Sequence, residues 1–277
     1  MMLAVGEALV AVQGPFTAQA VEGPLRDAFL VWLDSPDNNR APGRTCLQAC
    51  EALKQGLPFH EATVAGSKGC GANMRVQPVG LLEIDEVTRS SLAQFQAALT
   101  HGHPTALAAS DLTAAAIAFL LDGEEPAALP VRLRDYARVH RELYHEAWLG
   151  PLWQRPGATT PQDYIARGWD ECLAVLDRLE AALVVADRRA DPCLATGAGW
   201  VAEEALATGM LCFLLFPDDP VQAIRRAAET AGDSDSIACL AGAFAGARHG
   251  LDAWPVSWME RVEYKERIVT LGRAWDR

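Results

Sequence analysis

The segment from Ala238 to Gly250 is rich in alanine and glycine, and it strongly limits the folds open to this chain. Glycine inside a helix costs roughly 1 kcal/mol relative to alanine. Gly242 and Gly246 are therefore poor choices for a surface helix. They suit a helix that lies against neighbouring backbones, because small side chains permit a close approach. We therefore predict a helix over 234–248, buried at the centre of a helical bundle.

The rest of the sequence also favours an all-α fold. Alanine and leucine are abundant and β-branched residues are scattered, which favours helix over sheet. Pro24 suits the first position of a helix. The 277 residues contain no fixed-period repeat and no long Pro/Gly linker, so we expect one all-α domain over 1–277. Apolar periodicity predicts helices over 3–12, 24–33, 43–53, 84–99, 104–121, 132–144, 161–186, 199–216, 220–228, 234–248 and 258–275.

Charge and cysteine content limit the partners of this chain. Its formal net charge is −12, whereas nucleic-acid binding needs a basic surface, so we expect no nucleic-acid partner. The seven cysteines are irregularly spaced without a C-x-x-C pair, which predicts reduced thiols in a cytoplasmic protein. No apolar run approaches the roughly 20 residues of a membrane span, and no signal peptide is evident. We therefore expect no membrane partner.

A short acidic turn precedes the Ala/Gly-rich helix. Asp233, Asp235 and Ser236 stand at positions i, i+2 and i+3 after Gly232. Their oxygens can converge on one point if the backbone turns there into a helix, and Mg²⁺ takes oxygen ligands of this kind. We therefore predict that these three residues are metal ligands. The alternative is that Asp233 merely caps the helix.

The interval 66–80 is rich in glycine and irregular. Glycines let a backbone approach a ligand closely and direct consecutive amides at a phosphate. The alternative is a tight structural turn, with Arg75 as a buried salt-bridge partner that orients it. The candidate anion-binding residues are Ser67, Lys68, Gly69, Cys70 and Gly71.

Two histidines, His101 and His103, stand at a break before a predicted helix that begins at Pro104. A single histidine is usually a structural residue. Because these two lie near a candidate anion site, a binding role and a structural role remain open for both.

Taken in order, these segments resemble the ADP-ribosylglycohydrolase family. The similarity covers nearly the whole chain, and its most specific part is the Gly-Asp-x-Asp-Ser element in the Ala/Gly-rich helix. It rests on Ser67-Lys68-Gly69-Cys70-Gly71 with Met74-Arg75 and Pro78, on Thr100-His101, on Gly199-Trp200-Val201, and on Gly232-Asp233-Ser234-Asp235-Ser236-Ile237 with Ala241-Gly242-Ala243.

The resemblance implies a single compact all-α domain of orthogonally packed helices with a central metal cleft for two Mg²⁺ ions. Asp233, Asp235 and Ser236 would be metal ligands. The loop from Ser67 to Gly71 would hold the diphosphate of ADP-ribose, and His101 would contact a phosphate or the nearby ribose. Cys70 stands where some relatives have asparagine.

The implied activity is Mg²⁺-dependent hydrolysis of the N- or O-glycosidic bond at C1 of the distal ribose. Mg²⁺ would position the ribose hydroxyls and a water, and would stabilise charge in an oxocarbenium-like transition state. The partner would be an ADP-ribosylated protein or ADP-ribose, and we expect a monomer. The resemblance identifies neither the catalytic residue nor the acceptor side chain in this chain.

The start of the chain departs from the family pattern. Relatives carry a Gly-Asp-x-x-Gly helix and a Thr-Asp-Asp-Thr element that completes the metal site, whereas Met1 to Leu9 resembles the helix after that element. One hypothesis is a hydrolase whose remaining ligands lie upstream of Met1. A second is a non-catalytic binding or structural relative, like the crystallin-like members, and a third is an ADP-ribose reader without turnover. The intact Asp233, Asp235 and Ser236 favour the hydrolase.

Overall fold

The computed structural model describes residues 1–155 and 157–275 of the chain, and helices are its regular elements. Two isolated β-bridges pair Val64 with His101 and Gly69 with Val201. The all-α prediction is therefore confirmed. The α-helices are α1 (Met2–Ala11), α2 (Ala18–Leu33), α3 (Arg44–Lys54), α4 (Phe59–Ala62), α5 (Gln77–Gly80), α6 (Glu86–Ala98), α7 (Pro104–Leu121), α8 (Leu129–His140), α9 (Glu146–Leu149), α10 (Pro161–Val185), α11 (Cys193–Thr196), α12 (Ala202–Leu215), α13 (Pro220–Ala228), α14 (Ser234–His249), α15 (Val256–Arg261) and α16 (Lys265–Trp275), joined by the 3₁₀-helices η1 (Cys70–Arg75), η2 (Pro126–Ala128), η3 (Gly150–Gln154) and η4 (Leu251–Ala253).

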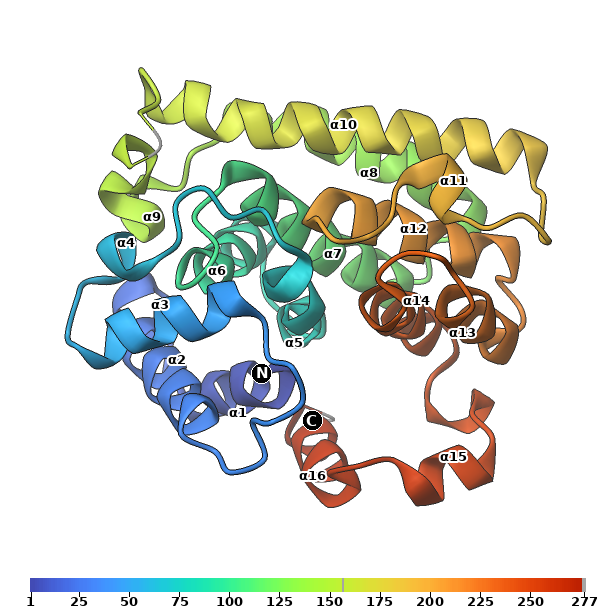
Figure 1. Ribbon diagram of the computed structural model, residues 1–277, viewed down its shortest axis with the longest axis horizontal. Helices are drawn as coiled ribbons and strands as arrows, with labels where there is room; N and C mark the ends of the chain where they lie inside the picture. The colour runs from blue at the N-terminus through green and yellow to red at the C-terminus, as the bar shows by residue number, and fades with distance from the viewer. Residues whose placement is uncertain (156, 276–277) are drawn as a thin grey trace.

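Helix α7 is the central helix of the fold. It contacts α6, α10, α12 and α14, which surround it (Figure 1). By length and composition alone α7 could cross a membrane, but 94% of its residues are buried inside the structure. Its apolar character is thus explained by its place in the protein core.

The Ala/Gly-rich helix α14 packs closely against its neighbours, as its composition predicts. Leu240, Ala241 and Phe244 are fully buried. A Cβ atom added to Gly209 of α12 would lie 2.9 Å from the Cβ of Leu240. A side chain at Gly209 would therefore push α12 and α14 apart. Ala243, on the opposite side of the helix, is partly exposed. Only one face of α14 is therefore deeply buried.

Most predicted helices are shifted by up to four residues, as where 132–144 is observed at 129–140. Two predicted helices differ more strongly from the structure. The predicted start at Pro24 is wrong, because α2 begins at Ala18, where the Thr17 hydroxyl accepts a hydrogen bond from the Ala20 amide. This cap outweighs the preference of proline for a first turn. The predicted helix over 258–275 is two helices, α15 and α16, separated by a break at Tyr264, whose φ is +55°.

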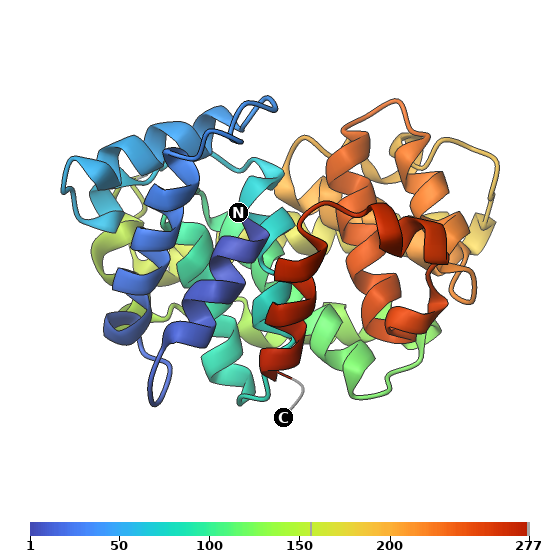
Figure 2. The same cartoon turned by 90° about the horizontal axis from the view of Figure 1, so that it is seen from below.

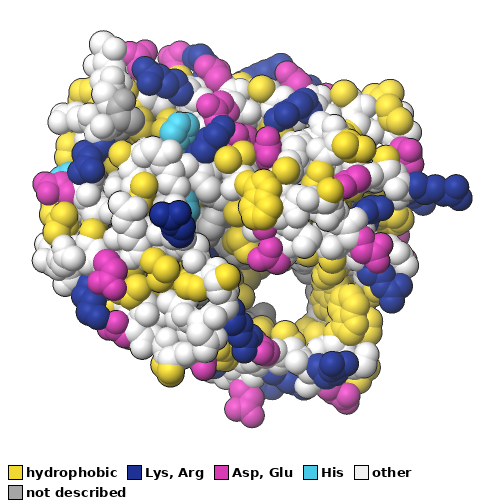
Figure 3. Space-filling view, in the orientation of Figure 1, with side chains coloured by type: hydrophobic (Ala, Val, Ile, Leu, Met, Phe, Trp, Pro, Cys, Tyr) yellow, Lys and Arg dark blue, Asp and Glu magenta, His cyan; other side chains and the backbone are white. Residues whose placement is uncertain are grey.

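The C-terminal helices form an arm that returns to the start of the chain. Figure 2 shows α16 beside α1, and a Cβ atom at Gly6 would overlap the side chain of Leu271. Arg267 of α16 also donates two hydrogen bonds to the Glu7 carboxylate, at 2.8 and 2.9 Å. Between this arm, α1 and α14, an opening is visible in the surface (Figure 3).

Candidate functional site

The loop before α14 is held against a second loop by a backbone hydrogen bond. The amide of Asp233 donates to the carbonyl of Ala198 at 2.7 Å. A Cβ atom at Gly232 would overlap that carbonyl oxygen. Glycine at 232 therefore allows the close approach that fixes the position of Asp233.

The predicted metal ligands Asp233 and Ser236 lie together at the start of α14. The Ser236 hydroxyl donates to Oδ2 of Asp233 at 2.8 Å, and both residues are buried. Asp233 occupies the N-cap position, but its side chain makes no capping hydrogen bond. Its carboxylate is thus turned toward Ser236 instead of the helix backbone, which favours the ligand interpretation over simple capping.

The third predicted ligand, Asp235, is exposed, yet its carboxyl group is close enough to act on Asp233. Burial and the neighbouring Asp235 raise the pKa of Asp233 above its ordinary value. Within residues 1–155 and 157–275, no three His, Cys, Asp or Glu side chains are grouped so that they could hold a metal ion. The described residues therefore do not show the predicted metal cleft.

Cys70 joins the glycine-rich loop to this acidic turn. Its thiol, free like those of the other six cysteines, donates to Oδ2 of Asp233 at 3.2 Å and lies 3.3 Å from the Ser236 hydroxyl. Burial raises the pKa of the Cys70 thiol to about 12, so the thiol is neutral at pH 7. The structure thus brings a predicted phosphate-loop residue into contact with two predicted metal ligands.

The rest of the predicted phosphate loop is fixed by its backbone. Ala202 donates its amide hydrogen to the carbonyl of Lys68 at 2.9 Å, next to the bridge between Gly69 and Val201. On the other side, the hydroxyls of Ser67 and Thr45 share a hydrogen bond of 2.8 Å. The loop is therefore held both by the start of α12 and by α3.

His101 lies against the glycines of this loop and is only 2% exposed. A Cβ atom at Gly69 would lie 3.5 Å from His101 Nε2, and one at Gly71 would lie 3.4 Å from it. Burial, with a smaller contribution from Arg75, lowers the pKa of His101 to about 3. The imidazole is therefore neutral at physiological pH.

Lys68 is already engaged by two glutamates that the sequence interpretation did not identify. Its Nζ donates to Glu171 of α10 at 2.7 Å and to Glu203 of α12 at 2.5 Å. Glu203 is 5% exposed, and burial raises its pKa despite the lysine beside it. The Lys68 ammonium group therefore neutralises protein carboxylates, and a phosphate would compete with them for it.

Arg75 is buried, as the structural alternative proposed, but its partners are neutral. Its guanidinium donates to the side chain and backbone of Gln96 and to the Thr100 hydroxyl, at 2.6–2.8 Å. It also lies 4.5 Å from the centre of the Phe29 ring. Desolvation consequently lowers the pKa of Arg75. The expected salt bridge is replaced by neutral hydrogen-bond acceptors.

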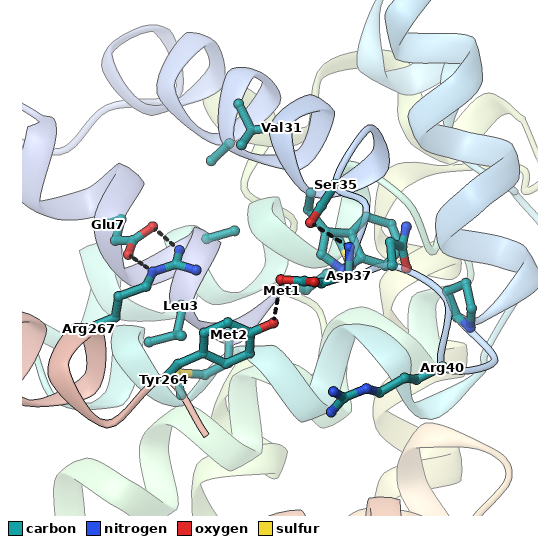
Figure 4. Close-up of a pocket in the computed structure, with 15 residues that line it drawn as sticks. Met1, Met2, Leu3, Glu7, Val31, Ser35, Asp37, Arg40, Tyr264 and Arg267 are labelled. Carbon is teal, nitrogen blue, oxygen red and sulfur yellow. Dashed lines mark hydrogen bonds and ion pairs between the residues drawn. The ribbon is translucent and has the colours of Figure 1, made fainter. Parts of the chain in front are cut away.

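A separate cavity of about 560 Å³ opens between α1, α2, the loop over 34–43 and the start of α16 (Figure 4). None of the predicted site residues lines it. Arg267 pairs with Glu7, and Arg40 pairs with Glu263 at 2.5 Å. The arginines of this cavity are thus already neutralised by carboxylates. Met1 also lines it, and the Met1 sulfur lies 3.6 Å from Arg75 Nη1.

Comparison with known proteins finds one family over the full chain, because the family described as ADP-ribosylglycohydrolase matches residues 1–277. Human ADP-ribosylhydrolase ARH3 is 27% identical over 229 residues, which cover 76% of this chain and 58% of that protein. The mouse protein of the same name is 27% identical over 227 residues, covering 76% and 57%. This chain therefore spans less than two thirds of the length of those relatives.

A solved structure described as an ADP-ribosylglycohydrolase-related protein complex has the same fold. Its TM-score is 0.66 at 22% sequence identity, over 99% of this chain and 78% of that chain. The structural similarity therefore includes the helices around the glycine-rich loop and the acidic turn.

Proposed function

Because the chain belongs to the ADP-ribosylglycohydrolase family, we propose that it removes ADP-ribose from modified protein side chains. The reaction would hydrolyse the N- or O-glycosidic bond at C1 of the distal ribose. The contact of Cys70 with Asp233 and Ser236 carries this proposal. ADP-ribose presents a diphosphate next to that ribose. The contact brings the glycine-rich loop beside the side-chain oxygens of Asp233 and Ser236, and this supports a shared site for the two parts of the ligand.

Diphosphate binding would depend mainly on backbone amides. Gly69 and Gly71 have no side chains, so His101 can pack close to the loop backbone. Backbone amides of a glycine-rich loop suit phosphate oxygens. Lys68 would act differently from the sequence interpretation, since its ammonium group is held by Glu171 and Glu203. It would fix the shape of the loop and lower the negative charge near the ligand.

Asp233, Asp235 and Ser236 would hold Mg²⁺. Two carboxylates and a hydroxyl are the oxygen donors that this ion takes, and Asp233 and Ser236 already share one point of contact at 2.8 Å. Bound there, Mg²⁺ would supply Lewis-acid stabilisation and positioning of the ribose hydroxyls. The protein residues would orient the ligand, with the loop holding the diphosphate and His101 a phosphate or the ribose.

A second candidate function is ADP-ribose binding without turnover. It is favoured by the partial set of metal ligands among residues 1–155 and 157–275. In this case the glycine-rich loop and His101 would bind the ligand, and no bond would be cleaved.

An ADP-ribose release assay separates these functions. Peptides modified on arginine or on serine would be incubated with the protein, with Mg²⁺ or with EDTA, and binding of free ADP-ribose would be measured by calorimetry. Mg²⁺-dependent release from either peptide supports the hydrolase. Binding without release supports the second function, and absence of both contradicts the two.

A further inference from the structure

Arg75, Thr100 and His101 form a buried hydrogen-bonded chain that ends at the glycine-rich loop. Arg75 Nη2 donates to Thr100 Oγ1 at 2.8 Å, and Thr100 Oγ1 lies 2.7 Å from His101 Nδ1. All three residues are at most 2% exposed. Within the described residues, the hydrogen bonds of the imidazole ring involve Nδ1 alone.

The direction of these hydrogen bonds follows from the chemistry of the three groups. A guanidinium can only donate, so Thr100 Oγ1 is the acceptor of the Arg75 hydrogen bond. The hydroxyl has one proton, and a buried donor without a partner is destabilising. His101 Nδ1 is the neighbouring group that can accept this proton, and it can do so only without a hydrogen of its own.

We propose that Arg75, acting through Thr100, fixes His101 as the neutral tautomer with its hydrogen on Nε2. This nitrogen borders the backbone of Gly69 and Gly71. His101 therefore presents a donor to the same space as the loop amides, which suits a phosphate or ribose oxygen of the ligand. Arg75 and Thr100 are positioning residues, and this ligand assignment rests on the proposed function.

The protonated nitrogen of His101 can be read directly by long-range ¹H–¹⁵N NMR of the whole protein. In the wild type we expect the Nε2–H tautomer at pH 7. Thr100→Val removes the proton that Nδ1 accepts, so we expect a mixture of tautomers, and Thr100→Ser should restore a single one. An Nδ1–H tautomer or an imidazolium in the wild type overturns the proposal, as does a Thr100→Val spectrum like that of the wild type.

Binding of ADP-ribose, measured by calorimetry, tests the consequence of the fixed tautomer. We expect Thr100→Val to raise the dissociation constant about tenfold, and Thr100→Ser to restore it. Thr113→Val is a matched control, because Thr113 is also buried and its hydroxyl has no partner among the described residues. If the wild type shows the Nε2–H tautomer but no ADP-ribose binding, the proposed function fails and the assignment of the tautomer stands.

Discussion

Cys70 donates its thiol hydrogen to the carboxylate of Asp233 at 3.2 Å, although 163 residues separate them in the sequence. This contact joins the start of η1 to the turn between α13 and α14. Each loop alone has an ordinary structural explanation, as a tight turn or a capped helix. Their contact is the observation on which the proposal of a shared ligand site rests.

Asp233→Asn should separate metal binding from folding. Burial and Asp235 raise the pKa of Asp233, so without metal the native protein disfavours this charge at pH 7. In the unfolded chain the Asp233 carboxyl group loses its proton near pH 3.8, whereas in the native protein it does so only at a higher pH. As pH rises from 3.8 to the native pKa, the native protein therefore holds a proton that the unfolded chain has released, and the free energy of unfolding of the wild type should fall. We therefore expect the metal-free variant to be at least as stable as the wild type in urea at pH 7.

The same variant should lose its response to Mg²⁺. A ligand present at 100 times its dissociation constant stabilises a native protein by about 2.7 kcal/mol, which we expect for the wild type in thermal unfolding with Mg²⁺. Asp252→Asn is the control, since Asp252 lies on the surface in η4. A variant that keeps the full Mg²⁺ response would remove Asp233 from the metal site.

His101→Gln should reduce the sensitivity of the protein to acid. The native pKa of about 3 lies below the ordinary 6.5, so between these values the unfolded chain binds a proton that the native protein does not. Wild-type stability should therefore fall as pH decreases from 6.5, by at most about 1.4 kcal/mol per pH unit from this residue. We expect a shallower decline for the variant in urea unfolding from pH 7 to 4. His60→Gln, on a more exposed residue, should follow the wild-type curve.

The sequence allowed the helices to be predicted because their signals are local. Helices predicted over 104–121 and 220–228 have these bounds in the structure, and proline stands at the first position of both. Pro24 misled the prediction, because the Thr17 cap starts α2 at Ala18, six residues before Pro24. A break such as the one at Tyr264 depends on how α16 packs against α1, which helical periodicity does not encode.

Three of the predicted site residues, Cys70, Asp233 and Ser236, lie in contact in the structure, but the ion pairs around the glycine-rich loop could not be predicted from the sequence. The motif residues 67–71, His101 and 233–236 are recognisable along the chain. The partners of Lys68 are not, because Glu171 and Glu203 come from α10 and α12, and only tertiary packing brings them to the loop. The position of Glu203 just after Gly199-Trp200-Val201 was the one available signal.

Gly232→Ala should damage the site more than most glycine substitutions. The added methyl would overlap the backbone of Ala198, and overpacking of this kind costs typically about 1–3 kcal/mol. Because Asp233 must shift as well, we expect weaker Mg²⁺ binding by calorimetry. Gly23→Ala in α2, where nothing lies within 4 Å of the new Cβ, should instead stabilise the protein by roughly 0.5–1 kcal/mol. Equal stability of the two variants would contradict the close packing at Gly232.

Lys68→Met should destabilise the protein mainly through Glu203. The lysine is the hydrogen-bond donor to this buried carboxylate at 2.5 Å. The Lys68 side chain is 33% exposed, so we expect a loss below the roughly 3–5 kcal/mol of a fully buried pair. Glu203 is the more buried of the two glutamates. Glu171→Gln should therefore lower the free energy of unfolding less than Lys68→Met does. The double variant Lys68→Met/Glu203→Gln should recover much of the loss in urea unfolding. Additive effects of the two single changes would show that the pair is not coupled.

Trp200→Ala should weaken ligand binding and leave stability almost unchanged. Trp200 is 64% exposed, and it stands between Gly199, which packs against Ile237, and Val201, which pairs with Gly69. An exposed indole beside both loops offers a stacking surface for a base, worth roughly 1–3 kcal/mol by alanine substitution. We expect ADP-ribose affinity to fall by that amount in calorimetry, with Trp200→Phe retaining most of it. Leu194→Ala, at a position 85% exposed, should bind normally, and an unchanged affinity in Trp200→Ala would place the base elsewhere.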